Sequence, residues 1–267
     1  MNIKYIASFF AASLLLSAGP AGAAGDQDHA VSPPQGWGHV GPMGLYDRAA
    51  AQRGLQVYRE VCASCHGLKY VSFRTLTDLG FTEEEVKALA AEYEVEAEPD
   101  QDGEVEMRPG IPSDYFPSPY PNQEAAKASN NGAEPPDLSL MAKKRLGGED
   151  YIYSLMSGYR DPTEAELAHL EETVGGLPDT AYFNPYMAGR IIAMAPPLSD
   201  DLVEYTDGTA ATVEQMSYDI ATFLTWTAEP TMEERKRIGM QVMIYLLILC
   251  GLLYFAFKRV ARRVHGH

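Results

Sequence analysis

The sequence C-A-S-C-H at residues 62–66 is the most informative motif of this chain. In the pattern C-x-x-C-H, two thiols one helical turn apart can each form a thioether with a haem vinyl group, and the adjacent imidazole then lies beneath the iron. Apolar residues recur at helical spacing over residues 51–62, which predicts a helix leading into the motif. The sequence therefore predicts one covalently bound haem c, attached through Cys62 and Cys65 and ligated by His66.

Three other uses of the cysteine pair compete with haem attachment. A zinc site needs two further ligands at metal-binding spacing, but the chain has no second C-x-x-C, and its third cysteine, Cys250, lies in a long apolar run. A redox-active pair is expected beside a βαβ unit, which the sequence pattern does not predict. A plain disulfide in an oxidising compartment stays open. Haem attachment is the interpretation that the full five-residue motif favours.

The iron needs a sixth ligand or an open site, and methionine is the favoured ligand. Met194 lies between small alanines, directly before Pro196 and Pro197, which fix an extended backbone. A thioether in a rigid apolar loop is well placed for iron, although a methionine that simply fills the core would look the same. Met187 and, more weakly, His39 stay open as alternatives.

Two hydrophobic segments frame the chain. Residues 1–23 carry one early cation, an apolar stretch over 5–16 and the small residues A-G-A at 21–23, the layout of a secretory signal peptide cleaved after Ala23. The alternative is an uncleaved N-terminal anchor, for which the apolar stretch is short.

The second segment, residues 238–257, has no charge in twenty positions. Twenty helical residues span roughly 30 Å, the thickness of a hydrocarbon core, and its eleven Ile, Leu, Val and Phe favour insertion by roughly 5 kcal/mol. Its apolar character is not confined to one stripe, which favours a transmembrane helix over a buried core helix. The four cations of the tail 258–267 predict a cytoplasmic C-terminus and place residues 24–234 in the periplasm.

The charge of the chain is unevenly distributed. Its formal net charge is −16, but the span 26–234 holds all 37 acidic residues and only 13 basic ones, a charge of −24. This balance excludes a nucleic-acid binder, which needs a basic surface. A strongly acidic exported domain predicts attraction of a basic partner.

The remaining elements can be read coarsely. Asp or Glu occupies every even position from 92 to 106, and this alternation predicts an extended segment with one acidic edge, or a solvated loop without a partner. Residues 143–159 read as a helix that the glycines at 147 and 148 interrupt. Thr212 and Gln215 predict the start of a helix that Pro230 ends.

The chain resembles the cytochrome c1 family. The motifs that carry this resemblance are C-A-S-C-H at 62–66, P-P-D-L-S at 135–139, G-G-E-D-Y at 147–151, F-N-P-Y at 183–186, M-A-P-P-L at 194–198 and W-T-A-E-P at 226–230. The resemblance covers nearly the whole mature chain. It implies a mainly α protein: a class I cytochrome c-like core with large loop insertions, plus one C-terminal transmembrane helix. The signal peptide is of bacterial type, since it lacks the many arginines of a transit peptide.

The resemblance also implies roles for individual residues. It makes Met194 the sixth iron ligand, and it implies that Pro135 or Pro136 offers a backbone carbonyl to the free ring nitrogen of His66. Such a bond would fix the ring and strengthen the ligand. It further implies that Arg145 binds a haem propionate.

Packing around the haem follows from the same resemblance. Tyr151 is expected to line the haem. Gly54 and Tyr58 are expected where the first helix crosses the last, near Phe223 or Trp226.

The activity that the resemblance implies is a one-electron relay. The chain would accept electrons from the Rieske iron–sulfur protein and pass them to a soluble basic c-type cytochrome, packed beside cytochrome b in the lipid of a bacterial inner membrane. Two other classes stay open. One is a membrane-anchored cytochrome that donates electrons to a terminal oxidase, and the other is a haem sensor or peroxidase with an open iron position.

Overall fold

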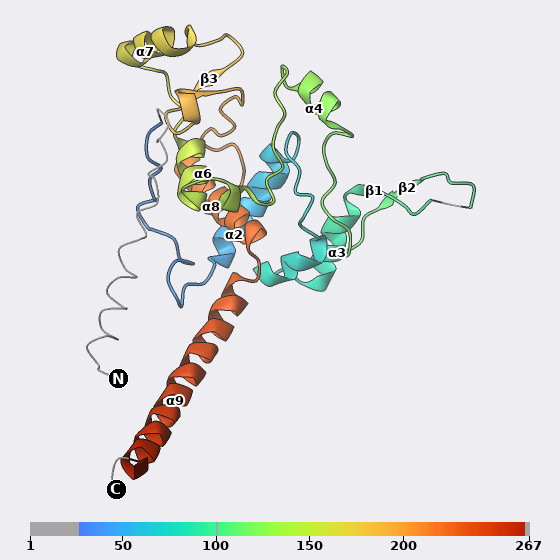
Figure 1. Cartoon of the computed structure of the whole chain (residues 1–267). Helices are drawn as coiled ribbons and strands as arrows, with labels where there is room; N and C mark the ends of the chain where they lie inside the picture. The colour runs from blue at the N-terminus through green and yellow to red at the C-terminus, as the bar shows by residue number, and fades with distance from the viewer. Residues whose placement is uncertain (1–26, 100, 265–267) are drawn as a thin grey trace.

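The computed structural model describes residues 27–99 and 101–264, so the predicted signal peptide lies outside the described residues. These residues form a mainly helical body from which one long helix projects (Figure 1). The expected mainly α architecture with a C-terminal membrane helix is confirmed. The elements in chain order are α2 (Arg48–Val57), η1 (Tyr58–Cys62), η2 (Phe73–Leu79), α3 (Glu83–Ala91), β1 (Glu94–Glu96), β2 (Met107–Pro109), α4 (Gln123–Ser129), α5 (Met141–Lys144), α6 (Gly148–Ser157), α7 (Glu164–Val174), β3 (Tyr182–Phe183), η3 (Ala188–Arg190), β4 (Ile191–Ile192), α8 (Val213–Ala228) and α9 (Met232–Val264).

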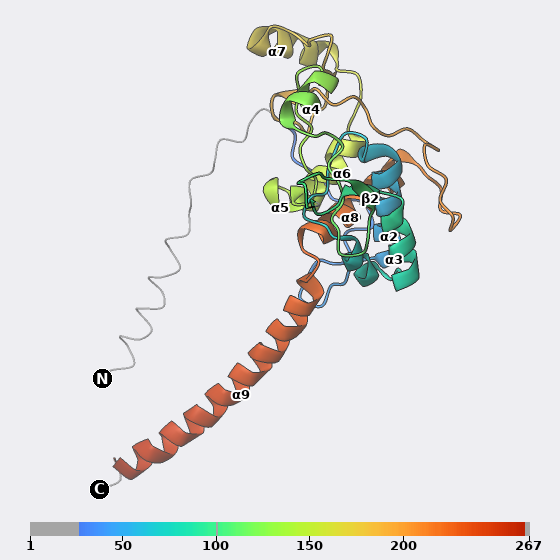
Figure 2. The same ribbon diagram turned by 90° about the vertical axis from the view of Figure 1, so that its right-hand side faces the viewer.

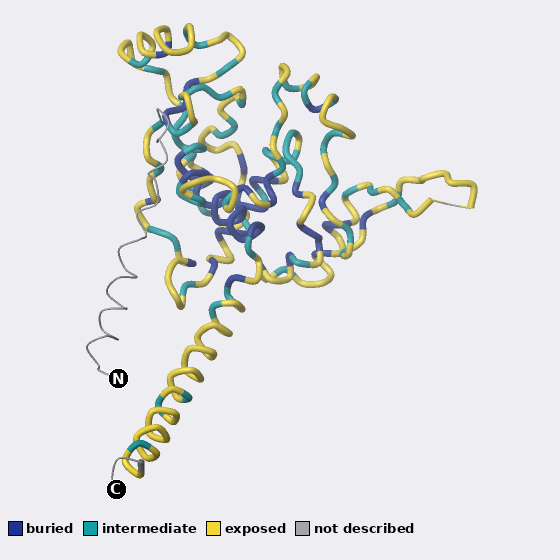
Figure 3. Tube along the Cα trace, viewed as in Figure 1, coloured by how far each residue is buried: buried dark blue, intermediate teal, exposed yellow. Residues whose placement is uncertain are grey.

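The core forms where α2 and α8 cross, at the centre of the body (Figure 3). Gly54 makes this close approach possible: a Cβ atom there would lie 2.1 Å from the Asp219 carbonyl oxygen and 2.6 Å from Phe223 Cβ. The predicted crossing of the first and last helices of the body near Phe223 is therefore confirmed. Tyr58, one turn later, packs its ring 6.1 Å from that of Phe223.

A buried ion pair joins the same two helices. The Arg53 guanidinium donates to both carboxylate oxygens of Asp219, at 2.9 Å each. The Asp219 side chain is fully buried, and Gln215 also donates to it at 3.0 Å. Burial raises the pKa of Asp219, while Arg53, Tyr205 and Gln215 oppose that rise. Because an unpaired buried carboxylate is costly, this pair fixes which faces of α2 and α8 meet.

Local sequence signals set the helix ends. Thr212 caps α8 by accepting a hydrogen bond from the Gln215 backbone N–H at 3.2 Å, as expected. The helix predicted over 143–159 is divided into α5 and α6 at the expected glycines. Gly147 adopts the left-handed conformation there, with φ 87°, which a residue with a side chain rarely adopts.

The start of the acidic run forms the first strand of a β-hairpin. Strands β1 and β2 pair antiparallel, with Glu94 opposite Pro109 and Glu96 opposite Met107. Glu94 and Glu96 are exposed while Val95 between them is half-buried, so the predicted acidic edge is present at β1. The hairpin projects away from the helical body (Figure 1).

Helix α9 leaves the body as a single projecting rod in both views (Figures 1 and 2). It is long and apolar enough to cross a membrane. Its first turns are tied to the body: Met232 is buried, and Glu233 pairs with Arg48 at 2.7 Å. Lys236 donates to the His39 carbonyl and, at 3.2 Å, to that of Gly44. The first turns of α9 therefore pack against the body. These contacts reach Lys236, beyond residue 234, where the predicted haem domain ends.

Candidate haem site

The cysteine motif begins in a local widening of the first helix. After α2 the chain makes one π-helical turn, η1, in which the Ala63 N–H bonds the Tyr58 carbonyl at 2.8 Å. The backbone then tightens, because the N–H groups of Cys65 and His66 both bond the Cys62 carbonyl, at 3.1 and 2.9 Å. Single π turns inside α-helices occur frequently at functional sites. The apolar spacing predicts the helix but not this wide turn.

His66 is oriented by a backbone carbonyl from a distant loop. Its Nδ1 lies 2.7 Å from the Pro136 oxygen, so Nδ1 carries the proton and Nε2 keeps a lone pair. The structure thus selects Pro136 over Pro135. Burial lowers the pKa of His66, although the Pro136 bond and the Asp137 charge oppose that shift. The imidazole is therefore neutral near pH 7, with Nε2 free among the described residues.

Further contacts hold the 135–139 loop against the motif. The Asp137 carboxylate accepts from the backbone N–H groups of Lys69 at 2.9 Å and Ser139 at 3.0 Å. The Leu138 N–H donates to the Gly67 carbonyl at 2.9 Å. On the other side, the Tyr58 hydroxyl donates to the His66 carbonyl at 2.9 Å. The histidine is thus fixed from both sides, and the roles of Asp137 and of the Tyr58 hydroxyl were not anticipated from the sequence.

The two motif cysteines form no disulfide with each other, and both are half-buried. Burial, with a smaller contribution from Cys65, raises the pKa of Cys62 to about 12. A redox-active dithiol needs a lowered thiol pKa instead, so this site does not fit the thioredoxin-like alternative. The Tyr120 hydroxyl lies 3.8 Å from Cys65 Sγ and is itself held by Asn130 at 3.0 Å.

Arg145 and Tyr151 lie together, as two candidate haem contacts should. The Arg145 guanidinium lies 5.7 Å from the centre of the Tyr151 ring. Arg145 is exposed, and within the described part of the chain no carboxylate pairs with it. Its charge is therefore available to an anionic group, and a guanidinium binds a carboxylate well.

The two candidate methionines follow one another in a single segment. Tyr151 donates to Met187 Sδ at 3.4 Å, so that sulfur already has a partner. Tyr159 donates to the Met194 backbone carbonyl at 3.1 Å, and among the described residues the Met194 thioether stays unengaged. Met194 is half-buried and follows directly after β4 and Ala193. This difference favours Met194 over Met187 as the residue that can offer a sulfur lone pair.

His39, the weaker candidate for the sixth iron ligand, makes structural contacts instead. It is buried with its Nε2 3.1 Å from a carboxylate oxygen of Glu149, and its ring packs 5.9 Å from that of Trp37. These contacts give it a structural role between the N-terminal segment and α6.

The donor set fits haem c better than a bare metal ion. A neutral imidazole with a free Nε2, two thiols one turn earlier and an unengaged thioether match what a six-coordinate haem c requires. In the part of the chain that the structure describes, no cluster of three or more His, Cys, Asp or Glu residues could hold a metal ion. The zinc alternative therefore finds no support in the described residues.

Fold and site together define a class: a mainly helical c-type cytochrome anchored to a membrane by one helix. Residues 37–264 match the cytochrome C1 family. The chain is 46% identical over 251 residues to cytochrome c1 of Rhodospirillum rubrum, covering 91% of this chain and 92% of that protein. It is 51% identical over 215 residues to the mitochondrial cytochrome c1 heme protein of Saccharomyces cerevisiae, covering 80% and 67%.

The chain belongs to the cytochrome c1 family. It is accordingly an electron-transport protein with one covalently bound haem c, as the motif and the resemblance predicted. A further relative is named cytochrome b/c1, from Bradyrhizobium diazoefficiens, with 48% identity over 237 residues. The match covers 84% of this chain but only 34% of that longer protein.

Proposed function

We propose that this chain relays single electrons from the Rieske iron–sulfur protein to a soluble c-type cytochrome, as the haem c subunit of the cytochrome bc1 complex. When bound, the haem supplies a one-electron iron couple. The chain's own residues would hold it: Cys62 and Cys65 would attach it, while His66 and Met194 would ligate its iron. Family membership and the relatives named for cytochrome b and cytochrome c1 together support a place beside cytochrome b.

The single observation that carries the proposal is the bond between His66 Nδ1 and the Pro136 oxygen. A hydrogen bond to the far nitrogen fixes the tautomer and orients the ring, and it raises the basicity of the ligating nitrogen. A ligand that is already in position reorganises little when the iron changes charge, which suits electron transfer better than catalysis at an open iron site. Filled His/Met ligation also raises the reduction potential.

The remaining site residues have supporting roles in the proposal. Arg145 binds a propionate and Tyr151 lines the haem pocket. Residues 24–234 lie in the periplasm, residues 238–257 cross the bacterial inner membrane and the basic tail 258–267 stays in the cytoplasm. The acidic body then faces a basic acceptor, which it attracts electrostatically.

The attachment roles are tested first. Denatured wild-type protein should keep one haem per chain through acid–acetone extraction, and either Cys62→Ala or Cys65→Ala should impair attachment. Haem that is extracted from the wild-type chain would refute the covalent assignment.

The ligand roles are tested by Met194→Leu, with Met187→Leu as the matched control. Axial ligands and their surroundings tune haem potentials over about 0.8 V, so Met194→Leu should lower the potential sharply and admit CO. The control should leave both unchanged, and the fold should survive in each because Leu and Met have similar volumes. An effect confined to Met187→Leu would reverse the assignment.

The relay itself is tested in membranes that contain the chain with its native partners. Quinol-dependent reduction of a basic cytochrome c should depend on this chain and decline in Met194→Leu. Electron flow that reaches only a terminal oxidase would support the alternative function instead.

A further inference from the structure

The segment that carries both methionines, residues 184–194, is closed on itself by its own backbone. The Met187 N–H bonds the Asn184 carbonyl at 3.1 Å, the Arg190 N–H bonds the Met187 carbonyl at 2.8 Å, and the Asn184 N–H bonds the Arg190 carbonyl at 2.9 Å. Strand β4 then pairs with β3, and Met194 follows two residues later. The position of Met194 therefore depends on how this closed segment is held.

Arg190 is the strained point of the segment. Its φ is 59°, directly after Gly189 with φ 75°, so two consecutive residues adopt the left-handed conformation. Glycine does so readily, whereas an arginine is penalised for its Cβ. Such a conformation persists where surrounding contacts hold it, which makes the partners of the Arg190 side chain important.

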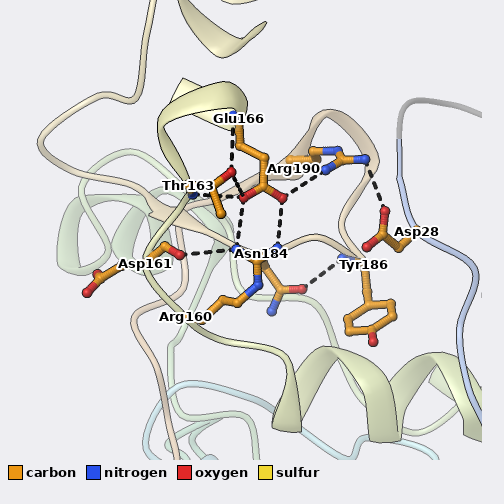
Figure 4. A network of polar contacts seen from close by, with 8 residues as sticks. All are labelled: Asp28, Arg160, Asp161, Thr163, Glu166, Asn184, Tyr186 and Arg190. Atoms are coloured by element: carbon orange, nitrogen blue, oxygen red, sulfur yellow. Dashed lines mark hydrogen bonds and ion pairs between the residues drawn. The ribbon is translucent and has the colours of Figure 1, made fainter. Parts of the chain in front are cut away.

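Two carboxylates hold the Arg190 guanidinium (Figure 4). Its Nη1 lies 3.2 Å from Glu166 Oε1, and its Nη2 lies 3.0 Å from Asp28 Oδ1. Glu166 is the better shielded of the two, with a side chain 17% exposed against 48% for Asp28. Because shielding from water strengthens an ion pair, Glu166 is the principal anchor.

Glu166 is itself rigidly placed at the start of α7. Both of its oxygens accept from the Arg160 guanidinium, at 2.7 and 2.9 Å. It also completes a capping box by accepting from the Thr163 backbone N–H at 2.8 Å. The other end of the loop is held separately, because the buried Asn184 amide donates to the Leu155 carbonyl at 2.8 Å.

We propose that Glu166 is a positioning residue for the haem iron: through Arg190 it holds segment 184–194 so that the Met194 thioether stays on the iron. This inference rests on the proposed function, in which Met194 is the sixth ligand. Glu166 acts from outside the haem pocket, and it lowers the fraction of time during which the sixth position is open.

The test compares Glu166→Gln with Glu164→Gln in the full haem-loaded chain. Glutamine keeps the size of Glu166 and an acceptor for the Thr163 N–H, but it places no charge between two guanidiniums. Glu164 lies on the same first turn of α7, is exposed and takes no part in the cluster of Figure 4, so its substitution removes the same charge without touching Arg190.

The readouts are the rate of cyanide binding to the ferric haem and the near-infrared band that reports the iron–methionine bond. Weakening of the charge-assisted hydrogen bond from Arg190 to this residue should raise the cyanide-binding rate about tenfold in Glu166→Gln and weaken the band. Glu164→Gln should match the wild type in both. Haem content and far-ultraviolet circular dichroism should stay unchanged in both variants, so that a general loss of folding is separated from loss of positioning.

Arg190→Lys gives a second, independent measurement if Glu166→Gln accumulates poorly. A lysine lacks the two-pronged fork that reaches Glu166 and Asp28 together, so the same rise in cyanide-binding rate is expected. The positioning role is refuted if both variants bind cyanide as slowly as Glu164→Gln. Failure of the proposed function itself would look different, because Met194→Leu would then leave the band and the cyanide-binding rate of the wild type unaltered.

Discussion

Gly54→Ala tests the contact on which the body of the protein is built. An alanine Cβ would lie 2.1 Å from the Asp219 carbonyl oxygen, about 1.3 Å closer than the 3.4 Å at which ordinary contact begins. The opposing atom is backbone in the middle of α8, so no side-chain rotation relieves the clash. The two helices must separate, and the ion pair of Arg53 with the fully buried Asp219 carboxylate lies directly beside the point of separation.

The size of the effect follows from two opposing contributions. Overpacking a well-packed core costs typically 1–3 kcal/mol, and a backbone clash lies toward the upper end of about that range. Replacing glycine by alanine within a helix returns about 1 kcal/mol through helix propensity. We expect a net loss of about 2 kcal/mol in the free energy of unfolding, which for a domain of this size lowers the melting temperature by about 4–8 °C.

The assay is thermal unfolding of the haem domain in the full chain, followed by circular dichroism and by haem absorbance. Gly239→Ala is the matched control, because Gly239 is also helical and an alanine Cβ there would meet no atom within 4 Å outside its own helix backbone. The Gly239→Ala control should leave the melting temperature of the haem domain unchanged. A Gly54→Ala chain as stable as the wild type would refute the close crossing of α2 and α8.

Three further predictions concern the anchor, acid stability and partner attraction. A chain that ends after Arg237 should have a free energy of unfolding about 2 kcal/mol higher than one that ends after Glu229, because only the longer chain keeps the buried Met232. Identical unfolding curves for the two chains would contradict this expectation. Pairing with Arg160 and the Thr163 N–H lowers the pKa of Glu166 from 4.5 to about 2. The ionised Glu166 therefore contributes its full stabilisation above about pH 5, and this contribution shrinks as the pH falls toward 2. A difference in melting temperature between wild type and Glu166→Gln that is the same at about pH 3 as at neutral pH would contradict this linkage. The association rate with a basic cytochrome c should fall steeply as ionic strength rises from about 10 to 300 mM. Neutralising the acidic residues of hairpin 94–109 should lower this rate only modestly, because the hairpin projects from the body. An association rate that does not depend on salt would contradict electrostatic steering.

Local patterns predicted three of the helical segments of the body. The helix before the motif, the glycine break between α5 and α6 and the cap of α8 each depend on residues within one or two turns of one another. The π turn η1 did not follow from the pattern, because apolar spacing over 51–62 fits an α-helix equally well. Its hydrogen bonds are visible only once the backbone is placed.

The candidate site divides in the same way. The motif at 62–66 predicts haem attachment because its two thiols and its imidazole lie within five residues of one another. Groups this close along the chain can be recognised without knowing the fold. The choice between Pro135 and Pro136 could not be made from sequence, since either carbonyl is equally suited chemically. The loop conformation settles it, 70 residues away from His66.

The haem chemistry, the membrane helix and the acidic character of the body can all be read from the order of the residues. Each of these features depends on a short segment or on overall composition, so the chemistry of the residues alone is enough to predict it. The meeting of Glu166 and Asp28 on Arg190, and the neutralisation of Asp219 by Arg53, emerge only from the folded chain. These contacts join residues 24, 162 and 166 positions apart, and which of many charged side chains meet depends on how the loops fold back.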